Sequence, residues 1–227
     1  MKFGIATFVT DEGICPVELG RAVEDRGFES LFVAEHSHIP TSRTTPYPSG
    51  GELPRVYYRT LDPFVTLTAV AVVTTRLVVG TGIALMIQRD PITTAKEVAS
   101  LDLVSSGRVI FGIGAGWNRE EMRHHGTDPR TRGRLLDERM RAMRSLWTDE
   151  KAEFHGEFVH IEPSYAWPKP VQEPHPPIYV GGNSDATFRR IAEYGHGWLA
   201  NPHAPDRMAA RIALLRDVAG RVVAPGR

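Results

Sequence analysis

The chain has 227 residues, and its 27 Lys and Arg residues balance its 27 Asp and Glu residues, so its formal net charge is zero. This balance gives no reason to expect nucleic acid or a membrane as the main partner, and we expect small-molecule ligands. The single cysteine, Cys15, excludes an internal disulfide and fits a reducing compartment. No apolar run is long enough to cross a bilayer and no signal-peptide pattern occurs, so we expect a cytoplasmic protein.

Apolar, β-prone runs alternate with helical segments along the whole chain. We expect six strands, at residues 3–9, 30–34, 76–85, 109–113, 178–180 and 198–200. We expect helices that begin at or near Pro16, Asp62, Asp90, Asn118, Thr131, Ser184 and Asp206. The last helix is expected to end near Val218, with Val222 and Val223 beyond it. Because no change in composition divides the chain, we expect residues 1–227 to form one domain.

Several helix boundaries are marked by capping residues. Asp62 and Asp90 each precede a proline, which is the pattern of an N-cap followed by proline at the first helical position. Gly27 and Gly107 follow helices, as C-terminal glycines do. The helix over residues 131–147 has one apolar face that we expect to pack in the core. That face consists of Leu136, Met140, Met143 and Trp147.

Two segments are expected to be insertions. Residues 40–60 are rich in Pro, Gly, Ser, Thr and Arg and are too long for an ordinary connection, which indicates a lid or a binding loop. Residues 151–177 begin with an alternating stretch, 153–161, that predicts a small hairpin around His155 and Gly156. Six prolines in residues 163–177 predict an extended, irregular loop.

Repeated strand-then-helix units indicate a parallel sheet wrapped by helices, and their number favours a (β/α) barrel over an open doubly wound sheet. Active sites of such barrels lie at the carboxyl ends of the strands. The unusual residues of this chain fall at those ends. They are His36 with His38, Thr81 with Gly82, residues 114–117 and residues 181–184.

The stretch 108–121 joins a buried strand to a helix through Gly112, Gly114 and Gly116. Bare backbone at the end of a strand leaves room for a ligand, but the same glycines are also explained by close packing and a sharp turn. The spacing differs from the nucleotide fingerprint of doubly wound folds. Asn118 is a plausible N-cap, and Glu120 and Glu121 are acids that favour a helix start.

Several motifs occur together in one order. They are Val33-Ala-Glu-His36, the loop Pro46-Tyr-Pro-Ser-Gly-Gly-Glu-Leu-Pro54, Gly80-Thr-Gly-Ile83, the run from Phe111 to Glu121 and Tyr179-Val-Gly-Gly-Asn-Ser184. As a set they resemble the luciferase-like monooxygenase superfamily, and within it the branch that depends on the deazaflavin coenzyme F420. The resemblance implies a TIM-barrel-like (β/α) fold that binds a reduced flavin or deazaflavin at its rim.

The resemblance also implies roles for individual residues. His36, the candidate catalytic residue, packs near the ring of the cofactor, and the peptide segment Thr81, Gly82 and Ile83, often cis in the family, supports one face of that ring. Gly114, Ala115 and Gly116 are further cofactor contacts. The cofactor's phosphate binds at Gly181, Gly182, Asn183 and Ser184, where glycine N–H groups at a helix N-terminus suit an anion. Simple capping of that helix by Asn183 or Ser184 is the alternative.

Other readings of the histidines stay open. His36 has the titration range for proton exchange near neutral pH, and it is equally suited to close the barrel rim as an ordinary polar residue. His38 with His124 and His125 raises the question of a metal, but without cysteines or an HExxH pattern we expect none. Trp117 stands where sugar-phosphate dehydrogenases of the superfamily have an acid, so that role is not carried over.

The sequence contains about six of the family's eight βα units, which predicts a C-terminally shortened barrel with open edges that favour a homodimer. The leading hypothesis is an F420-dependent oxidoreductase that transfers a hydride to or from a small organic substrate. An FMNH2-dependent monooxygenase that uses oxygen is the alternative. A non-catalytic flavin-binding or degenerate truncated family member is the second alternative.

Overall fold

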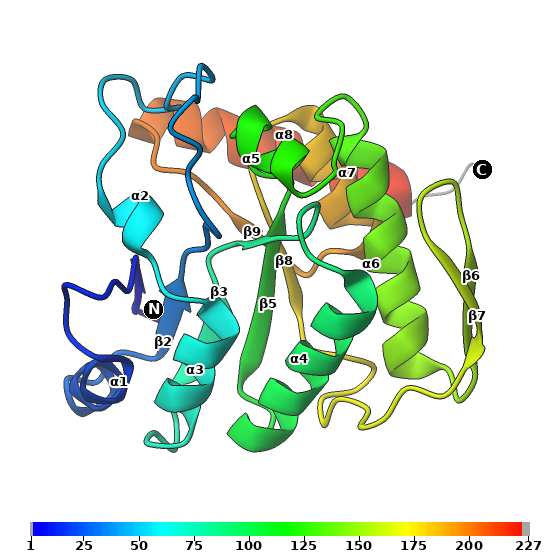
Figure 1. Ribbon diagram of the computed structural model, residues 1–227, viewed down its shortest axis with the longest axis horizontal. Helices are drawn as coiled ribbons and strands as arrows, with labels where there is room; N and C mark the ends of the chain where they lie inside the picture. Colours follow the sequence, from blue (N-terminus) through cyan, green and yellow to red (C-terminus); the bar gives the residue numbers. More distant parts are fainter. Residues whose placement is uncertain (1, 224–227) are drawn as a thin grey trace.

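The computed structural model describes residues 2–223 and contains a parallel sheet with helices packed against it (Figure 1). The strands lie in the order β1-β2-β3-β5-β8-β9, and the short strand β4 pairs with the C-terminal end of β5. Their bounds are β1 Gly4–Thr7, β2 Ser30–Val33, β3 Val78–Thr81, β4 Ala84–Leu85, β5 Val109–Gly114, β8 Ile178–Gly181 and β9 Gly197–Leu199. Every pair in this sheet is parallel, so all carboxyl ends lie at one edge.

The helices follow the strands as the sequence predicts. They are α1 Pro16–Asp25, α2 Val56–Arg59, α3 Pro63–Ala71, α4 Pro91–Ser105, α5 Arg119–His124, α6 Arg132–Thr148, α7 Asp185–Tyr194 and α8 Pro205–Val223. Helices α1, α3, α4 and α6 pack side by side in that order, and α7 packs against α8. The fold is therefore an α/β barrel with six βα units, incomplete because β1 and β9 do not pair within the described residues.

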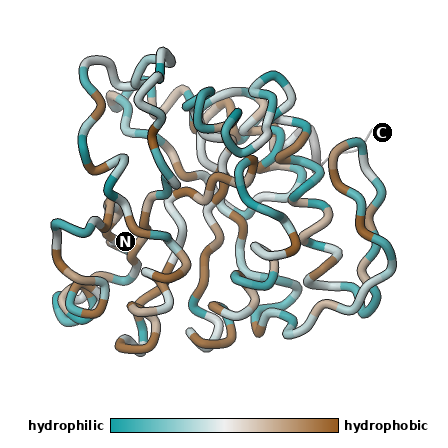
Figure 2. The backbone as a smooth tube through the Cα atoms, viewed as in Figure 1, coloured by the Kyte–Doolittle hydropathy of each residue, from teal (hydrophilic) through white to brown (hydrophobic). Residues whose placement is uncertain are grey.

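The core lies between the strands and these helices. Phe111 and Ile113 of β5 are fully buried, as are Leu31 and Val79 on neighbouring strands. Figure 2 shows the same pattern, with hydrophobic residues along the central strands and hydrophilic residues on outer helices and loops. The predicted face of α6, including Met140 and Trp147, is buried in this core. Strands buried on both sides explain the nearly continuous apolar runs in the sequence.

Capping occurs where the sequence predicts it. The Asp62 carboxylate accepts hydrogen bonds from the N–H groups of Phe64 and Val65, and the Asp90 carboxylate accepts one from Thr93. Helix α4 ends at Ser106, which has a left-handed φ of 57°, followed by Gly107 at 76°. A good N-cap contributes about 1 kcal/mol, so these local signals fix where each helix begins.

The structure corrects three details. Helix α8 does not end near residue 218, because the single Gly220 does not break it, and Val222 and Val223 belong to the helix. The third predicted strand is divided into β3 and β4 around Gly82 and Ile83. The loop 40–60 contains a short helix, α2, that the composition of the loop does not reveal.

The insertion at 151–177 contains the predicted hairpin. Its strands are β6 Ala152–His155 and β7 His160–Ser164, which pair antiparallel in a separate two-stranded sheet. In Figure 1 the hairpin lies on the flank of the molecule beside α6. No regular element occurs between Ser164 and Ile178, as the prolines predict. Within residues 2–223 no helix has the length and apolar character needed to cross a membrane.

Candidate functional site

A cleft of about 780 Å³ lies at the carboxyl ends of the parallel strands. Its volume is within the range of small-molecule and cofactor sites. The cleft brings together segments that are far apart in the sequence, from the ends of β2, β3, β5 and β8. The predicted site residues that line it are His36, Gly82, Ile83, Ala115, Gly116, Gly181, Gly182, Asn183 and Ser184.

Two predicted site residues lie behind the wall of the cleft. The Thr81 side chain is buried, and its hydroxyl donates a hydrogen bond of 2.6 Å to the carbonyl oxygen of Gly112. Gly114 is covered by Ile83, since a Cβ atom at position 114 would lie 1.9 Å from the Cδ1 atom of Ile83. Neither residue lines the cleft. Thr81 contacts the backbone of Gly112, and Gly114 leaves space for the Ile83 side chain.

The glycines therefore divide into two kinds. Gly112 and Gly114 are packing positions, because a Cβ atom on either would come within 1.9 Å of Thr81 or Ile83. Gly116 lines the cleft and has a φ of +65°, a conformation that favours glycine. Close packing therefore explains Gly112 and Gly114, a sharp turn explains Gly116, and contact of Gly116 with a ligand stays a prediction. The peptide bond between Gly82 and Ile83 is cis, as the family resemblance implies.

His36 is held by a buried carboxylate that the sequence analysis did not connect with it. The Nδ1 atom of His36 lies 2.7 Å from an Oε atom of Glu121, and their side chains are 5% and 0% exposed. The other carboxylate oxygen of Glu121 accepts a hydrogen bond from the Ser37 N–H group. With Nδ1 engaged by Glu121, the Nε2 atom of His36 is the ring nitrogen left for a ligand in the cleft.

The expectation that Glu121 is a helix-starting acid is confirmed but incomplete, because Glu121 also pairs with His36. Asn118 caps α5 as predicted, accepting a weak hydrogen bond from the Glu121 N–H group, but the Glu121 side chain turns inward. Burial raises the pKa of the Glu121 carboxyl, but the hydrogen bond and charge of His36 and the Ser37 N–H group outweigh burial, so the pKa lies below its usual value. The carboxylate is therefore ionised at neutral pH.

Aromatic side chains surround His36. The rings of Tyr57 and Trp117 lie 5.2 and 5.8 Å from the His36 ring, centroid to centroid. Tyr57 comes from α2 in the loop 40–60, which also contributes Pro48 to the cleft wall, so the predicted binding loop does reach the site. Burial and the neighbouring Tyr47 hydroxyl raise the pKa of Tyr57, which keeps its hydroxyl protonated.

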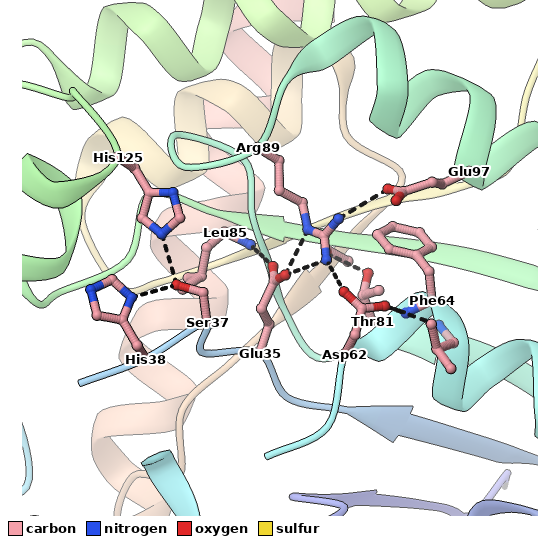
Figure 3. A network of polar contacts seen from close by, with 12 residues as sticks. Glu35, Ser37, His38, Asp62, Phe64, Thr81, Leu85, Arg89, Glu97 and His125 are labelled. Atoms are coloured by element: carbon pink, nitrogen blue, oxygen red, sulfur yellow. Dashed lines mark hydrogen bonds and ion pairs between the residues drawn. The ribbon is translucent and has the colours of Figure 1, made fainter. Parts of the chain in front are cut away.

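A partly buried ion-pair network, in which Glu35 is buried and Asp62 is 45% exposed, fixes the end of β2 next to His36 (Figure 3). One Glu35 oxygen accepts a hydrogen bond of 2.6 Å from the Leu85 N–H group, and the other accepts one from Arg89. Arg89 also pairs with Asp62 at 2.6 Å and with Glu97 at 2.9 Å. The network connects β2 with β4 and with the starts of α3 and α4. It thereby holds the backbone that carries His36.

Residues 181–184 form the N-terminal approach to α7. The Ser184 hydroxyl accepts a hydrogen bond from the Thr187 N–H group, so the capping alternative is correct for Ser184. Gly182 has a φ of +116°, and its carbonyl oxygen accepts a hydrogen bond from the Trp198 indole. The side-chain oxygen of Asn183 is buried without a partner among the described residues. The loop thus combines glycine backbone with a helix N-terminus and one unsatisfied polar atom.

Three arginines that the sequence did not single out also line the cleft near this loop. They are Arg130, Arg132 and Arg190. Arg190 is held by Asp137 at 2.6 Å, whereas Arg130 and Arg132 are shared with a neighbouring hollow that also contains Arg119 and Arg123. Arg130 also pairs with Asp128 at 2.7 Å, so among the described ion pairs Arg132 is the arginine of the three without a carboxylate partner, and its charge favours an anion. The signal was present only as arginines scattered over 119–132, which no local pattern connects with residue 181.

The histidines near the mouth of the cleft contact one another. The Ser37 hydroxyl lies 2.9 Å from His38 Nδ1 and 2.7 Å from His125 Nε2, and His38 Nε2 lies 2.9 Å from His124 Nδ1 (Figure 3 shows the Ser37 contacts). Burial lowers the pKa of His125, and the charges of His38 and His124 lower it further. Ser37, His38, His124 and His125 therefore form a chain of side-chain hydrogen bonds with one another.

The sequence of this chain is similar to those of known proteins. The family model described as luciferase-like monooxygenase matches residues 16–225. An uncharacterized protein of Mycobacterium tuberculosis is 44% identical over 222 residues, which cover 96% of this chain and 78% of that protein. An FMNH2-dependent dimethylsulfone monooxygenase of Pseudomonas putida is 30% identical over 129 residues, or 56% of this chain and 36% of that protein.

Solved structures give the same picture of the fold. Monooxygenase RslO1 from Streptomyces bottropensis superposes with a TM-score of 0.82 at 26% identity, covering 100% of this chain and 68% of the other. The coenzyme F420-dependent tetrahydromethanopterin reductase of Methanopyrus kandleri superposes with a TM-score of 0.72 at 22% identity, covering 97% and 62%. Both resemblances extend over nearly all of this chain and a smaller share of each neighbour.

Proposed function

The chain belongs to the luciferase-like monooxygenase family, and from that premise we propose that it is an F420-dependent oxidoreductase. Its substrate is a small organic molecule that exchanges a hydride with the deazaflavin. The observation that carries the proposal is the single cleft in which His36, Ile83 and the glycine loop 181–184 meet. The F420-dependent reductase among the structural neighbours supports the choice of cofactor.

The residues of the cleft fit a phosphorylated ring cofactor. The N–H groups of Gly181 and Gly182 precede α7, whose N-terminus favours a negative charge, and Arg132 adds positive charge. These groups would hold the phosphate. The Ile83 side chain packs over Gly114 and Gly181, which gives the cleft an apolar floor for a flat ring.

When bound, the deazaflavin supplies the hydride chemistry, because no protein side chain performs it. The protein's own contribution centres on His36. Glu121 orients the ring through Nδ1, which leaves Nε2 to hold or deliver a proton at the substrate. The aromatic rings of Tyr57 and Trp117 exclude water around that nitrogen. In this assignment Glu121 is a positioning residue, since it acts through His36.

An FMNH2-dependent monooxygenase is the second candidate. The dimethylsulfone monooxygenase among the relatives and RslO1 among the structures favour it. A non-catalytic flavin-binding protein is the third candidate. The unpaired edges of β1 and β9 within the described residues favour this third candidate, since two such edges allow two copies of the chain to associate.

A parallel titration separates the candidates. The purified chain is titrated with F420 and with FMN while cofactor fluorescence is followed, and circular dichroism checks that the chain is folded. We expect saturable binding of F420 that is weaker for Arg132→Gln. Binding of FMN alone, with turnover that consumes oxygen, would replace the proposal with the monooxygenase. A folded chain that binds F420 without turnover of any substrate would favour the non-catalytic protein.

A further inference from the structure

The β6–β7 hairpin presents two histidines and two glutamates on one face. His155 and His160 are directly opposite each other in the antiparallel register, and Glu153 and Glu162 lie two residues from them along each strand. The opposite face carries Phe154 and Ile161, which pair across the strands and pack against the hydrophobic core. The period of two in a β-strand thus places all four polar side chains toward solvent.

The two imidazoles are in direct contact. His155 Nδ1 lies 2.9 Å from Nδ1 and 3.1 Å from Nε2 of His160. The Nε2 atom of His155 lies 2.6 Å from a Glu153 oxygen, and the Nε2 atom of His160 lies 2.9 Å from a Glu162 oxygen. One ligand atom each from His155, His160 and Glu162 fit within 4.8 Å of one another. These three groups therefore lie close enough together to share one ion, and Glu153 contacts the other ring nitrogen of His155.

The charge of this face favours a divalent cation. With neutral imidazoles the two carboxylates leave a charge of about −2, and a metal ion binds an imidazole through a ring nitrogen that carries no proton. Nitrogen ligands at about 2.0–2.1 Å from a tetrahedral zinc ion lie about 3.3 Å apart. The observed 2.9–3.1 Å between the His155 and His160 nitrogens is close to that separation.

We propose that the β6–β7 hairpin binds a divalent transition-metal ion of the zinc type through His155, His160 and Glu162. Imidazole nitrogen with one carboxylate is the ligand set of such ions rather than of calcium or magnesium. Three protein ligands leave a coordination position open to water. Glu153 accepts a hydrogen bond from the ring nitrogen of His155 that does not bind the ion, and so orients that ring.

The hairpin is fixed before an ion binds. The buried Glu138 carboxylate of α6 accepts hydrogen bonds from the N–H groups of Glu157, Phe158 and Val159 at the hairpin turn. The two strands pair at both ends of the hairpin, His155 with His160 next to the turn and Ala152 with Ser164 at the open end. None of the ligands lines the cleft, so this site is separate from the proposed cofactor site. A bound ion would act as a cross-link between β6 and β7.

Zinc binding to the full chain tests the proposal. The apo protein is titrated with Zn²⁺ in competition with a chromophoric indicator, and binding of one ion per chain is expected. His160→Gln and Glu162→Gln should each weaken binding by at least about tenfold, and Glu153→Gln by about tenfold through the orientation of His155. Glu157→Gln is the matched control, because it removes the same charge from the same hairpin, but its side chain pairs with Arg134.

Circular dichroism of each variant shows whether it is folded. All four altered side chains are exposed, so folding should be retained. A rise in melting temperature on addition of Zn²⁺ should occur in the wild type and in Glu157→Gln but not in His160→Gln. The proposal is overturned if the wild type binds no zinc. It is equally overturned if the double variant His155→Gln/His160→Gln still binds zinc. Loss of binding in His38→Gln would then place the ion at His38 instead.

Discussion

Two histidine–carboxylate pairs in this protein have nearly the same geometry and very different surroundings. His36 and Glu121 are 2.7 Å apart with side chains 5% and 0% exposed, whereas His155 and Glu153 are 2.6 Å apart with side chains 43% and 52% exposed. Water screens the exposed pair and leaves its members free to change partner, but it cannot replace either member of the buried pair. Burial, and not distance, decides which pair is structural.

Replacing Glu121 with alanine should have the largest effect. The substitution leaves the buried His36 Nδ1 and the partly buried Ser37 N–H group without their acceptor, and we expect the free energy of unfolding to fall by about 3 kcal/mol. Urea denaturation followed by circular dichroism measures this change. A loss as small as that of an exposed pair would show that water enters the space and takes the place of the carboxylate.

His36→Gln should come next, with its main effect on turnover; the glutamine amide N–H can still donate to the Glu121 carboxylate, so the loss of stability should be smaller than for Glu121→Ala. Glutamine keeps a polar side chain at the end of β2 but cannot exchange a proton, so we expect kcat/KM with the bound cofactor to fall by about 100-fold. Glu157→Gln is the control, and it should leave kcat/KM unchanged because residue 157 lies outside the cleft. Equal activities of wild type and His36→Gln would remove His36 from the chemistry.

The buried pair should also give stability a dependence on pH. The folded-state pKa of Glu121 lies below the ordinary value of 4.5, so its stabilisation is present above that pH and is lost as pH falls through the folded-state pKa. Wild type should therefore lose more stability than Glu121→Gln between neutral pH and the acid range. Parallel urea curves at several pH values measure the difference. Identical slopes for the two proteins would contradict the assigned shift.

Glu153→Ala should have the smallest effect in the absence of metal. An exposed pair contributes little, so we expect the free energy of unfolding to change by less than about 0.5 kcal/mol. The same substitution should weaken zinc binding, and this contrast between stability and binding distinguishes the exposed pair from the buried one. A large loss of stability without metal would show that the hairpin depends on Glu153 itself.

Local signals made much of the fold predictable. Asp62 and Asp90 cap helices within three residues of themselves, and the apolar spacing around Met140 is decided by one helix. Signals that need distant partners were missed. Glu121 pairs with a residue 85 positions away, and at its own position it looks like an ordinary acid of a first helical turn.

The candidate site follows the same division. The glycines at 116 and 181–182 mark the ends of strands and could be placed at one rim, but Arg130, just before α6, and Arg132, its first residue, reach the cleft only through the placement of the start of α6. The hairpin at 153–161 was predicted from alternation, whereas the metal question that the sequence raised concerned His38, His124 and His125. Recognising that His155 faces His160 requires the exact register, and the irregularity between Ala152 and Phe154 hides it.

Ile83 connects three motifs that are separate in the sequence. Its side chain fills the space above Gly114 and Gly181, where added Cβ atoms would lie 1.9 and 2.8 Å from it. The three positions should therefore covary in size through evolution, with a smaller residue at 83 accompanying alanine at 114 or 181. A double-mutant cycle in which Ile83→Ala rescues Gly114→Ala would reveal this coupling, which is invisible when each motif is considered alone.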